Sequence, residues 1–257
     1  MVKRIDIHTH LRTPGAVPSE DEMATMIRLA RRHGITRAVA LGNIRGAQQP
    51  TVEDIKAIND NTMAATRNHP EFFIGFCYLN PAHPVEFCLA EIERCVVQGG
   101  MRGLKFLTAV RANDRRLDPL VSRARELNIP VLYHAWYKRI GQLPHESTPA
   151  DIAELARRSP KVTFIMAHLT GCGERGVLDI LDTSNVLVDT SGGQPEAGLV
   201  EYAVARLGAK RILFGSDWPI RDFGVQVGRI LGAELTKTER DMIFSGNARR
   251  ILKGIAG

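Results

Sequence analysis

Two histidines separated by one residue stand near the start of the chain and are suited to binding a metal ion. His8 and His10 lie in the segment RIDIHTH, residues 4–10, where Ile5 and Ile7 alternate with polar residues. Side chains two residues apart in a strand project from the same face. We therefore expect both imidazoles on one face, within reach of one cation such as Zn²⁺, and both isoleucines on the other.

Further residues that can bind metal or move protons stand in other apolar runs of the sequence. They are Lys105 in GLKFL, His134 in PVLYHA, His168 in KVTFIMAH and Asp217 in RILFGSDW. Imidazole nitrogens and a carboxylate oxygen are ligands that Zn²⁺ prefers, and Mn²⁺ is a possible alternative. The sequence therefore predicts a site for one or two divalent ions, held by His8, His10, Asp217 and either His134 or His168. The full set of candidate ligands is His8, His10, His134, His168, Asp217 and Lys105.

The spacing of two residues also predicts how one of these histidines is presented. Phe164, Met166 and His168 are expected on the same face of their strand. The other histidines fall in predicted helix ends or loops, where we expect surface positions: His33, His69, His83 and His145.

Lys105 is flanked by apolar residues in the segment 103–107, so its ammonium group is expected to be buried. A buried ammonium must be paired or neutralised. The sequence leaves four states open. Lys105 pairs with an anionic substrate, pairs with Asp217 or another carboxylate, becomes carboxylated and bridges two metal ions, or sits at the strand end with its ammonium in water.

The elements that must position these residues follow a regular order. Apolar runs alternate with segments of helical periodicity at intervals of roughly 30 residues, the size of a βα unit. The runs lie at 4–10, 37–42, 72–80, 103–107, 130–135, 161–168, 185–191 and 211–218. Eight such units predict an α/β fold, a single-domain (β/α)₈ TIM barrel over residues 1–257, closed by helices in 236–252.

This fold would bring the ionisable residues together, because the C-terminal ends of barrel strands meet at one face. An open doubly wound sheet is the alternative. It is disfavoured because no G-x-G-x-x-G motif follows the first strand.

Composition narrows the class of protein. The net charge is +6, but the basic residues are scattered, so we expect no nucleic-acid partner and favour a small anionic substrate. No run approaches the roughly 20 apolar residues of a membrane span. A strand pattern begins within a few residues of the start, so we expect no secretory signal. The four cysteines form no C-x-x-C pair, which favours a reduced, cytoplasmic protein. A homo-oligomer is compatible with the sequence.

Taken together, the motifs DIHTH, YHA, MAH, FGSDWP and GNARRIL resemble the amidohydrolase superfamily. The resemblance is to its amidohydrolase-related (amidohydrolase 2) branch of metal-dependent hydrolases and decarboxylases. It implies a (β/α)₈ barrel with one or two divalent ions. In binuclear members a carboxylated lysine ends strand 4, a position that Lys105 matches loosely.

One segment also resembles another group of this superfamily. DIHTHLRTPG is similar to the dihydroorotase and allantoinase signature, in which the arginine after H-x-H holds a substrate carboxylate. That arginine would be Arg12. The motif GSDWP departs from the cyclic amidase pattern, so only an anion-binding role for Arg12 is carried over.

The predicted activity is hydrolysis of an amide, lactone or ester-like bond in a small carboxylate-bearing substrate. A bound ion lowers the pKa of water toward about 7, and Asp217 would accept the proton from that water. The ion, with His168 or His134, would polarise the substrate carbonyl. The alternatives are non-oxidative decarboxylation on the same ligands, a metal-independent lactonase, and a barrel that binds without turnover. Asp217 argues against the last, because a pure binding site needs no base.

Several other side chains are candidates for contacts with the substrate or with the histidines. Arg12 and Arg45 are expected to grip a carboxylate. Trp136 and Tyr137 either line the pocket or pack as ordinary core residues. Arg221 is either an anion contact or a surface residue. Asp189 and Ser191, at the end of the run 185–191, could orient a histidine.

Overall fold

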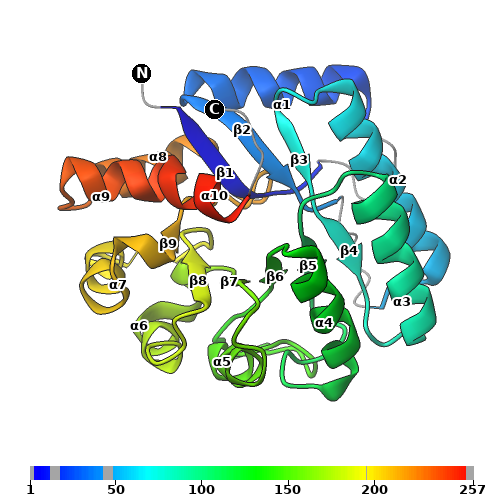
Figure 1. Ribbon diagram of the computed structural model, residues 1–257. Helices are drawn as coiled ribbons and strands as arrows, with labels where there is room; N and C mark the ends of the chain where they lie inside the picture. The colour runs from blue at the N-terminus through cyan, green and yellow to red at the C-terminus, as the bar shows by residue number, and fades with distance from the viewer. Residues whose placement is uncertain (1–2, 12–17, 43–48, 195, 253–257) are drawn as a thin grey trace.

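Parallel strands surround a central axis, and helices cover them on the outside (Figure 1). This computed structural model describes residues 3–11, 18–42, 49–194 and 196–252. The strands are β1 Arg4–Thr9, β2 Ile35–Ala40, β3 Phe73–Gly75, β4 Cys77–Leu79, β5 Leu104–Phe106, β6 Val131–Tyr133, β7 Phe164–Met166, β8 Val186–Asp189 and β9 Ile212–Leu213. The prediction of an α/β fold with a (β/α)₈ TIM barrel is confirmed.

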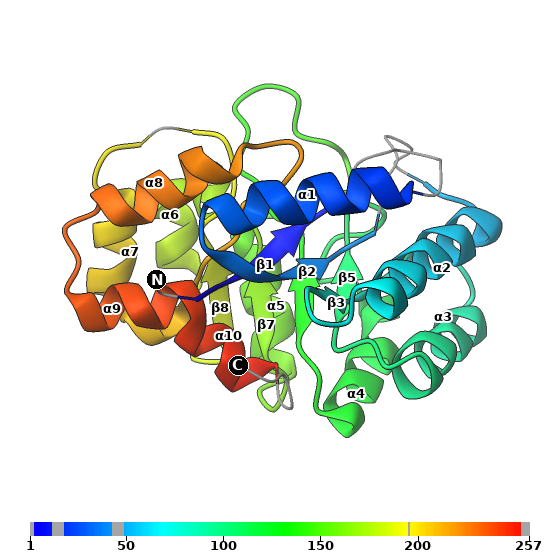
Figure 2. The same cartoon turned by 90° about the horizontal axis from the view of Figure 1, so that it is seen from above.

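The helices alternate with the strands, as the sequence pattern predicts. Their bounds are α1 Glu20–Arg32, α2 Val52–Asn68, α3 Val85–Ile92, α4 Asp118–Leu127, α5 Pro149–Arg158, α6 Leu169–Asp179, α7 Leu199–Leu207, α8 Phe223–Gly232, α9 Lys237–Asp241 and α10 Asn247–Ile251. Figure 2 shows α1 lying across the outside of β1 and β2. No helix among the described residues is long and apolar enough to cross a membrane.

Backbone hydrogen bonds close the ring of strands. The order β1-β2-β3 forms one sheet and β4 through β9 forms a second. The run 72–80, predicted as one strand, is divided into β3 and β4 at Phe76, whose N–H donates to the Ala40 carbonyl (3.1 Å). The second junction between the two sheets lies between β9 and β1. There the Ile7 backbone N–H donates to the Phe214 carbonyl (2.9 Å).

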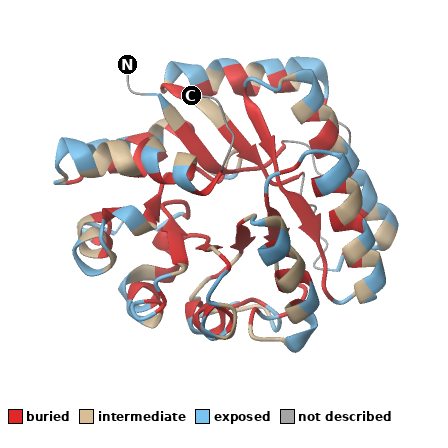
Figure 3. Ribbon diagram, viewed as in Figure 1, coloured by how far each residue is buried: buried red, intermediate tan, exposed pale blue. Residues whose placement is uncertain are grey.

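Two layers of apolar side chains hold the barrel. The outer layer packs strand residues against helices, so most helices bury one face and expose the other (Figure 3). The inner layer takes side chains from most strands, including Ile5, Ile7 and Leu132, together with Ala248 and Ile251 of α10. Within the segment 236–252, predicted to close the barrel, it is thus the last helix, α10, that packs against the inner layer.

The inner layer corrects one sequence expectation. Ile5 and Ile7 pack inside the barrel rather than on the face opposite the site. The pairing of β1 with β2 shifts register between Asp6 and Thr9, where β1 carries one more residue than its neighbour. Such a bulge changes which face the following side chains occupy. His8 can therefore face the same interior as Ile7.

A glycine substitution tests how tightly the inner layer is packed. An added Cβ at Gly103 would lie 2.5–2.7 Å from three ring atoms of the fully buried Phe76. We expect Gly103→Ala to lower the free energy of unfolding by about 1–3 kcal/mol, measured by urea denaturation. Gly228→Ala is the control, because Gly228 lies in α8 with open space around its Cβ position. It should stabilise by up to about 1 kcal/mol, and equal losses in both variants would contradict the packing argument.

Candidate metal centre

Every described candidate ligand lies at or close to the C-terminal end of a strand. His8 is the second-last residue of β1. His134 and His168 directly or closely follow β6 and β7, and Asp217 follows β9. The ring centroids of His8 and His168 are 4.8 Å apart, as are those of His134 and His168. The structure therefore brings these side chains, which come from distant parts of the chain, into one cluster.

Backbone conformation aims two of these residues. His168 has φ 69° and ψ 61°, and Asp217 has φ 63°, both in the left-handed region that non-glycine residues seldom occupy. Phe164 and Met166 pack in the outer layer against helices. The prediction that His168 shares their face is therefore wrong, because the chain leaves the strand geometry at His168 and turns its ring toward the other histidines.

An oxygen atom lies at hydrogen-bond distance from the Nδ1 atom of His8 and of His10, the nitrogen that faces away from the cluster. His8 Nδ1 lies 2.7 Å from Asp189 Oδ2, and His10 Nδ1 lies 3.2 Å from the Gly42 carbonyl. Both partners accept hydrogen bonds, so each Nδ1 carries the proton and each Nε2 keeps its lone pair. Asp189 also accepts from the Ser191 hydroxyl and from the His168 backbone N–H. It acts here as an acceptor that orients His8, the role predicted for it as one possibility.

The same arrangement recurs at the other two histidines. His168 Nδ1 lies 2.8 Å from Ser191 Oγ, and His134 Nε2 lies 2.8 Å from Glu146 Oε1. Each of the four rings thus has one nitrogen held by an oxygen atom and the other directed toward its neighbours. Contacts of this kind fix the orientation and tautomer of histidines that ligate metals.

The inward atoms have the spacing of ligands around one cation. His8 Nε2 and His10 Nε2 each lie 3.5 Å from Asp217 Oδ1. Bonds of about 2.1 Å in tetrahedral geometry separate two ligand atoms by about 3.4 Å. His8 Nε2 is buried and has no hydrogen-bond partner in the described structure. The donors therefore fit a divalent ion in chemistry and in spacing.

The second histidine pair lies close to this group. His134 Nδ1 and His168 Nε2 are 3.0 Å apart. Either nitrogen is available as a further ligand once the outer nitrogens carry the protons. This matches the expectation that His134 or His168 completes the coordination, and the choice between them stays a prediction.

Burial keeps the histidines in the form that binds metal. Burial is the main reason why the pKa values of His8 and His168 lie well below the ordinary value for histidine. The second cause is the charge of Lys105 for His8 and the charge of His8 for His168. Both rings are therefore neutral near pH 7. Burial alone would raise the pKa of Asp217, but His10, His8 and Lys105 outweigh it and lower that pKa, so the carboxylate is ionised.

Lys105 lies in β5 and is fully buried, with no hydrogen-bond partner for Nζ among the described residues. This excludes the state in which its ammonium reaches water. Burial lowers the pKa of Lys105 to about 8, although the negative charges of Asp189 and Asp217 act to raise it. No carboxylate oxygen in the described ranges forms an ion pair with it, which leaves an anionic substrate or carboxylation as its expected partner.

The aromatic residues after β6 take different positions. The Trp136 ring lies 5.0 Å from the His168 ring and stacks on His134 at 6.2 Å, so it borders the cluster. Tyr137 points away, since its hydroxyl donates to Asp179 of α6. Arg221 donates from Nη1 to the Ile220 carbonyl, and its guanidinium packs over Gly193. The predicted anion contacts Arg12 and Arg45 lie outside the described residues.

The structure adds residues that sequence reasoning missed. Glu146 is buried in the loop between β6 and α5, where it contacts His134 and Lys138. Only the length of the segment 136–147 hinted at a role. Asp6 is also buried, and its Oδ1 accepts from the backbone N–H of His8 (3.0 Å) and of Ser216 (2.9 Å). Burial raises the pKa of Asp6 to about 7.

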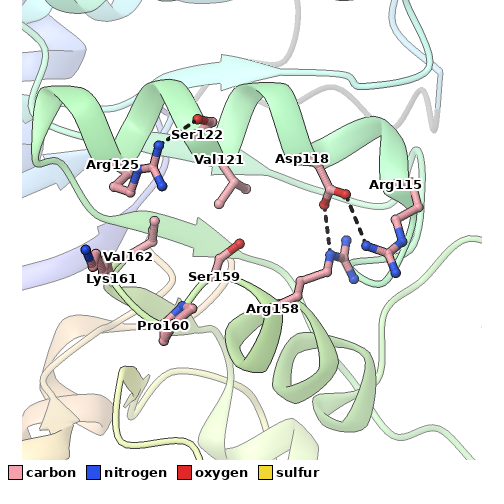
Figure 4. A pocket seen from close by; sticks show the side chains of 10 residues that line it. All are labelled: Arg115, Asp118, Val121, Ser122, Arg125, Arg158, Ser159, Pro160, Lys161 and Val162. Carbon is pink, nitrogen blue, oxygen red and sulfur yellow. Dashed lines mark hydrogen bonds and ion pairs between the residues drawn. The ribbon is translucent and has the colours of Figure 1, made fainter.

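Two cavities formed by described residues have no candidate ligand in their lining. One, of about 1170 Å³, lies between the loop residues Tyr137 and Lys138 and residues of α6 such as Gly171. Another, of about 360 Å³, lies between α4 and the end of α5 (Figure 4). There Asp118 bridges two arginines of the outer wall, and no histidine lines the cavity.

Comparisons with known proteins agree with this fold. A family model described as Amidohydrolase matches residues 5–254. No curated protein matches the chain. Among solved structures, a dihydroxybenzoic acid decarboxylase from Polaromonas with bound manganese has a TM-score of 0.77 at 20% identity, covering 98% of this chain and 97% of that one.

Two further structures have the same architecture. A 5-carboxyvanillate decarboxylase from Sphingomonas paucimobilis has a TM-score of 0.77 at 15% identity, over 98% of this chain and 99% of that one. A 4-oxalomesaconate hydratase from Rhodopseudomonas palustris has a TM-score of 0.72 at 18% identity, over 97% and 95%. At these identities the likeness concerns the fold.

Proposed function

The chain belongs to the amidohydrolase family, and from this premise we propose that it is a metal-dependent hydrolase of small carboxylate-bearing compounds. The bond cleaved is an amide, a lactone or another ester-like bond. The observation that supports this most is the convergence of neutral imidazole nitrogens and the Asp217 carboxylate, with each ring held from behind by an oxygen.

His8, His10 and Asp217 would hold the divalent ion, with His134 or His168 as a further ligand. Zn²⁺ suits this donor set, and Mn²⁺ is the alternative. When bound, such an ion activates water and polarises carbonyl groups. Asp217, ionised and next to His8 and His10, would accept the proton from the attacking water and pass it to the leaving group.

The other residues would bind and orient the substrate. His168 would donate to or polarise the carbonyl, and Trp136 would cover one side of it. The buried Lys105 ammonium would attract a substrate anion, because it has no other ion-pair partner among the described residues. Arg12 and Arg45 remain predicted anion contacts.

Decarboxylation of a small acid is the second candidate. It is favoured by one observation, which is that two of the solved structures with this fold are decarboxylases of aromatic acids. The same ligands would serve, and the substrate carboxylate would again be drawn to Lys105. The reaction differs because CO₂ leaves and water is not consumed.

Metal removal and a substrate panel test the proposal. We expect activity on at least one carboxylated lactone, cyclic amide or aromatic acid, loss of that activity after chelation, and recovery with Zn²⁺ or Mn²⁺. Measuring CO₂ release alongside product mass separates hydrolysis from decarboxylation. Full activity in the chelated protein would contradict the proposal and favour a metal-independent lactonase.

A further inference from the structure

Glu146 is a loop residue whose carboxylate is buried, which is unusual for an acidic side chain in a loop. It is 1% exposed, yet it belongs to the loop between β6 and α5. Burying a carboxylate costs free energy unless strong partners replace water. Strong hydrogen-bond partners must therefore hold this carboxylate in its buried position.

Three donors surround the Glu146 carboxylate. His134 Nε2 lies 2.8 Å from Oε1, and Lys138 Nζ lies 2.7 and 2.8 Å from the two oxygens. The Leu143 backbone N–H donates to Oε2 at 3.2 Å. The Lys138 ammonium and the Leu143 N–H can only donate, so both carboxylate oxygens of Glu146 act as acceptors here.

An acceptor at this point decides which nitrogen of His134 carries the proton. With Nε2–H donating to Glu146, the lone pair of neutral His134 is on Nδ1, the atom 3.0 Å from His168 Nε2. The ring is thus turned so that its free nitrogen faces the cluster. Lys138 in turn forms an ion pair with Glu146 (2.7 Å) and so neutralises the charge of its carboxylate. The Lys138 side chain is itself only 30% exposed.

We propose that Glu146 is a positioning residue, which fixes the tautomer and orientation of His134, and that Lys138 holds Glu146 in place. This inference rests on the proposed metal-dependent function, because it assigns Glu146 a role through a histidine of that site. The loop 136–147 is then part of the site, and its sequence sets how strongly His134 can bind. Removing such an outer contact typically weakens metal binding by about 10–100-fold.

Glu146→Gln is the informative variant. The glutamine is similar in size but can either accept from or donate to His134 Nε2, so it no longer selects one tautomer. We expect metal affinity, measured by competition with a chelator, to fall by about 10-fold or more, with the thermal unfolding temperature little changed. Lys138→Met should weaken metal binding in the same direction.

The matched control is Glu154→Gln on the neighbouring helix α5. Glu154 is 57% exposed and accepts from Asn113 (3.2 Å), away from the histidines. Its metal affinity should equal that of the unmodified protein. Equal affinity in Glu146→Gln would overturn the proposal.

A second measurement separates this inference from the metal hypothesis. The ¹⁵N spectrum of histidine side chains in metal-free protein reports the protonated nitrogen directly. We expect His134 to be the Nε2–H tautomer in the unmodified protein and a mixture in Glu146→Gln. Identical spectra would overturn the positioning role even if metal binds. Failure of the unmodified protein to bind any divalent ion would instead contradict the proposed function.

Discussion

Replacing Asp217 with asparagine is expected to lower kcat/KM by about 10³-fold or more. The amide keeps the size of the side chain but cannot take a proton from water and binds a cation weakly. Loss of positioned acid–base catalysis alone costs about 10²–10⁴-fold, and loss of an anionic ligand adds to it. The measurement is steady-state kinetics on the substrate found in the panel, together with metal content.

The control for this variant is Asp182→Asn. Asp182 is 66% exposed and pairs with Arg157 at the surface, so its loss should leave kcat/KM unchanged. A kcat/KM for Asp217→Asn within a few-fold of the unmodified protein would show that Asp217 neither moves the proton nor holds the ion.

Removing a histidine of β1 should have the largest effect on metal binding. In His8→Ala the inward Nε2 is lost and Asp189, fully buried, loses the donor 2.7 Å from its Oδ2. We expect metal affinity to fall by at least about 100-fold, more than the 10–100-fold cost of an outer contact. Chelator competition measures this, with circular dichroism to establish that the variant is folded.

Two other variants place this result in context. Asp189→Asn keeps the size of the side chain but weakens the acceptor, and should lie between His8→Ala and the unmodified protein. His33→Ala replaces the histidine at the C-cap of α1 and should leave metal affinity unchanged. Stoichiometric metal in His8→Ala at the normal affinity would contradict the ligand assignment.

The sequence was informative where residue type and strand order decide the outcome. A histidine or aspartate at the end of an apolar run breaks the pattern of a buried strand. In a barrel such breaks meet at one end of the ring. His8, His134 and Asp217 can therefore be grouped from the sequence alone. Helices with a clear N-cap residue, such as α2 with Thr51, are predicted from the sequence equally well.

Alternation failed where the backbone departs from regular strand geometry. The register shift between Asp6 and Thr9 and the left-handed φ of His168 both change the direction of a side chain. Neither leaves a mark in a pattern of apolar and polar residues, because each depends on pairing with a neighbouring strand or loop. Glu146 is not predicted for a related reason. An acidic residue in a loop is expected at the surface, and only tertiary contacts bury this one.

Crystallography at the metal absorption edges tests the central claim most directly. Crystals soaked with Zn²⁺ or Mn²⁺ should give an anomalous peak between His8 Nε2, His10 Nε2 and Asp217 Oδ1, with His134 or His168 completing the ligands. A site that stays without anomalous signal at saturating metal, or a peak bound elsewhere on the chain, would contradict the account.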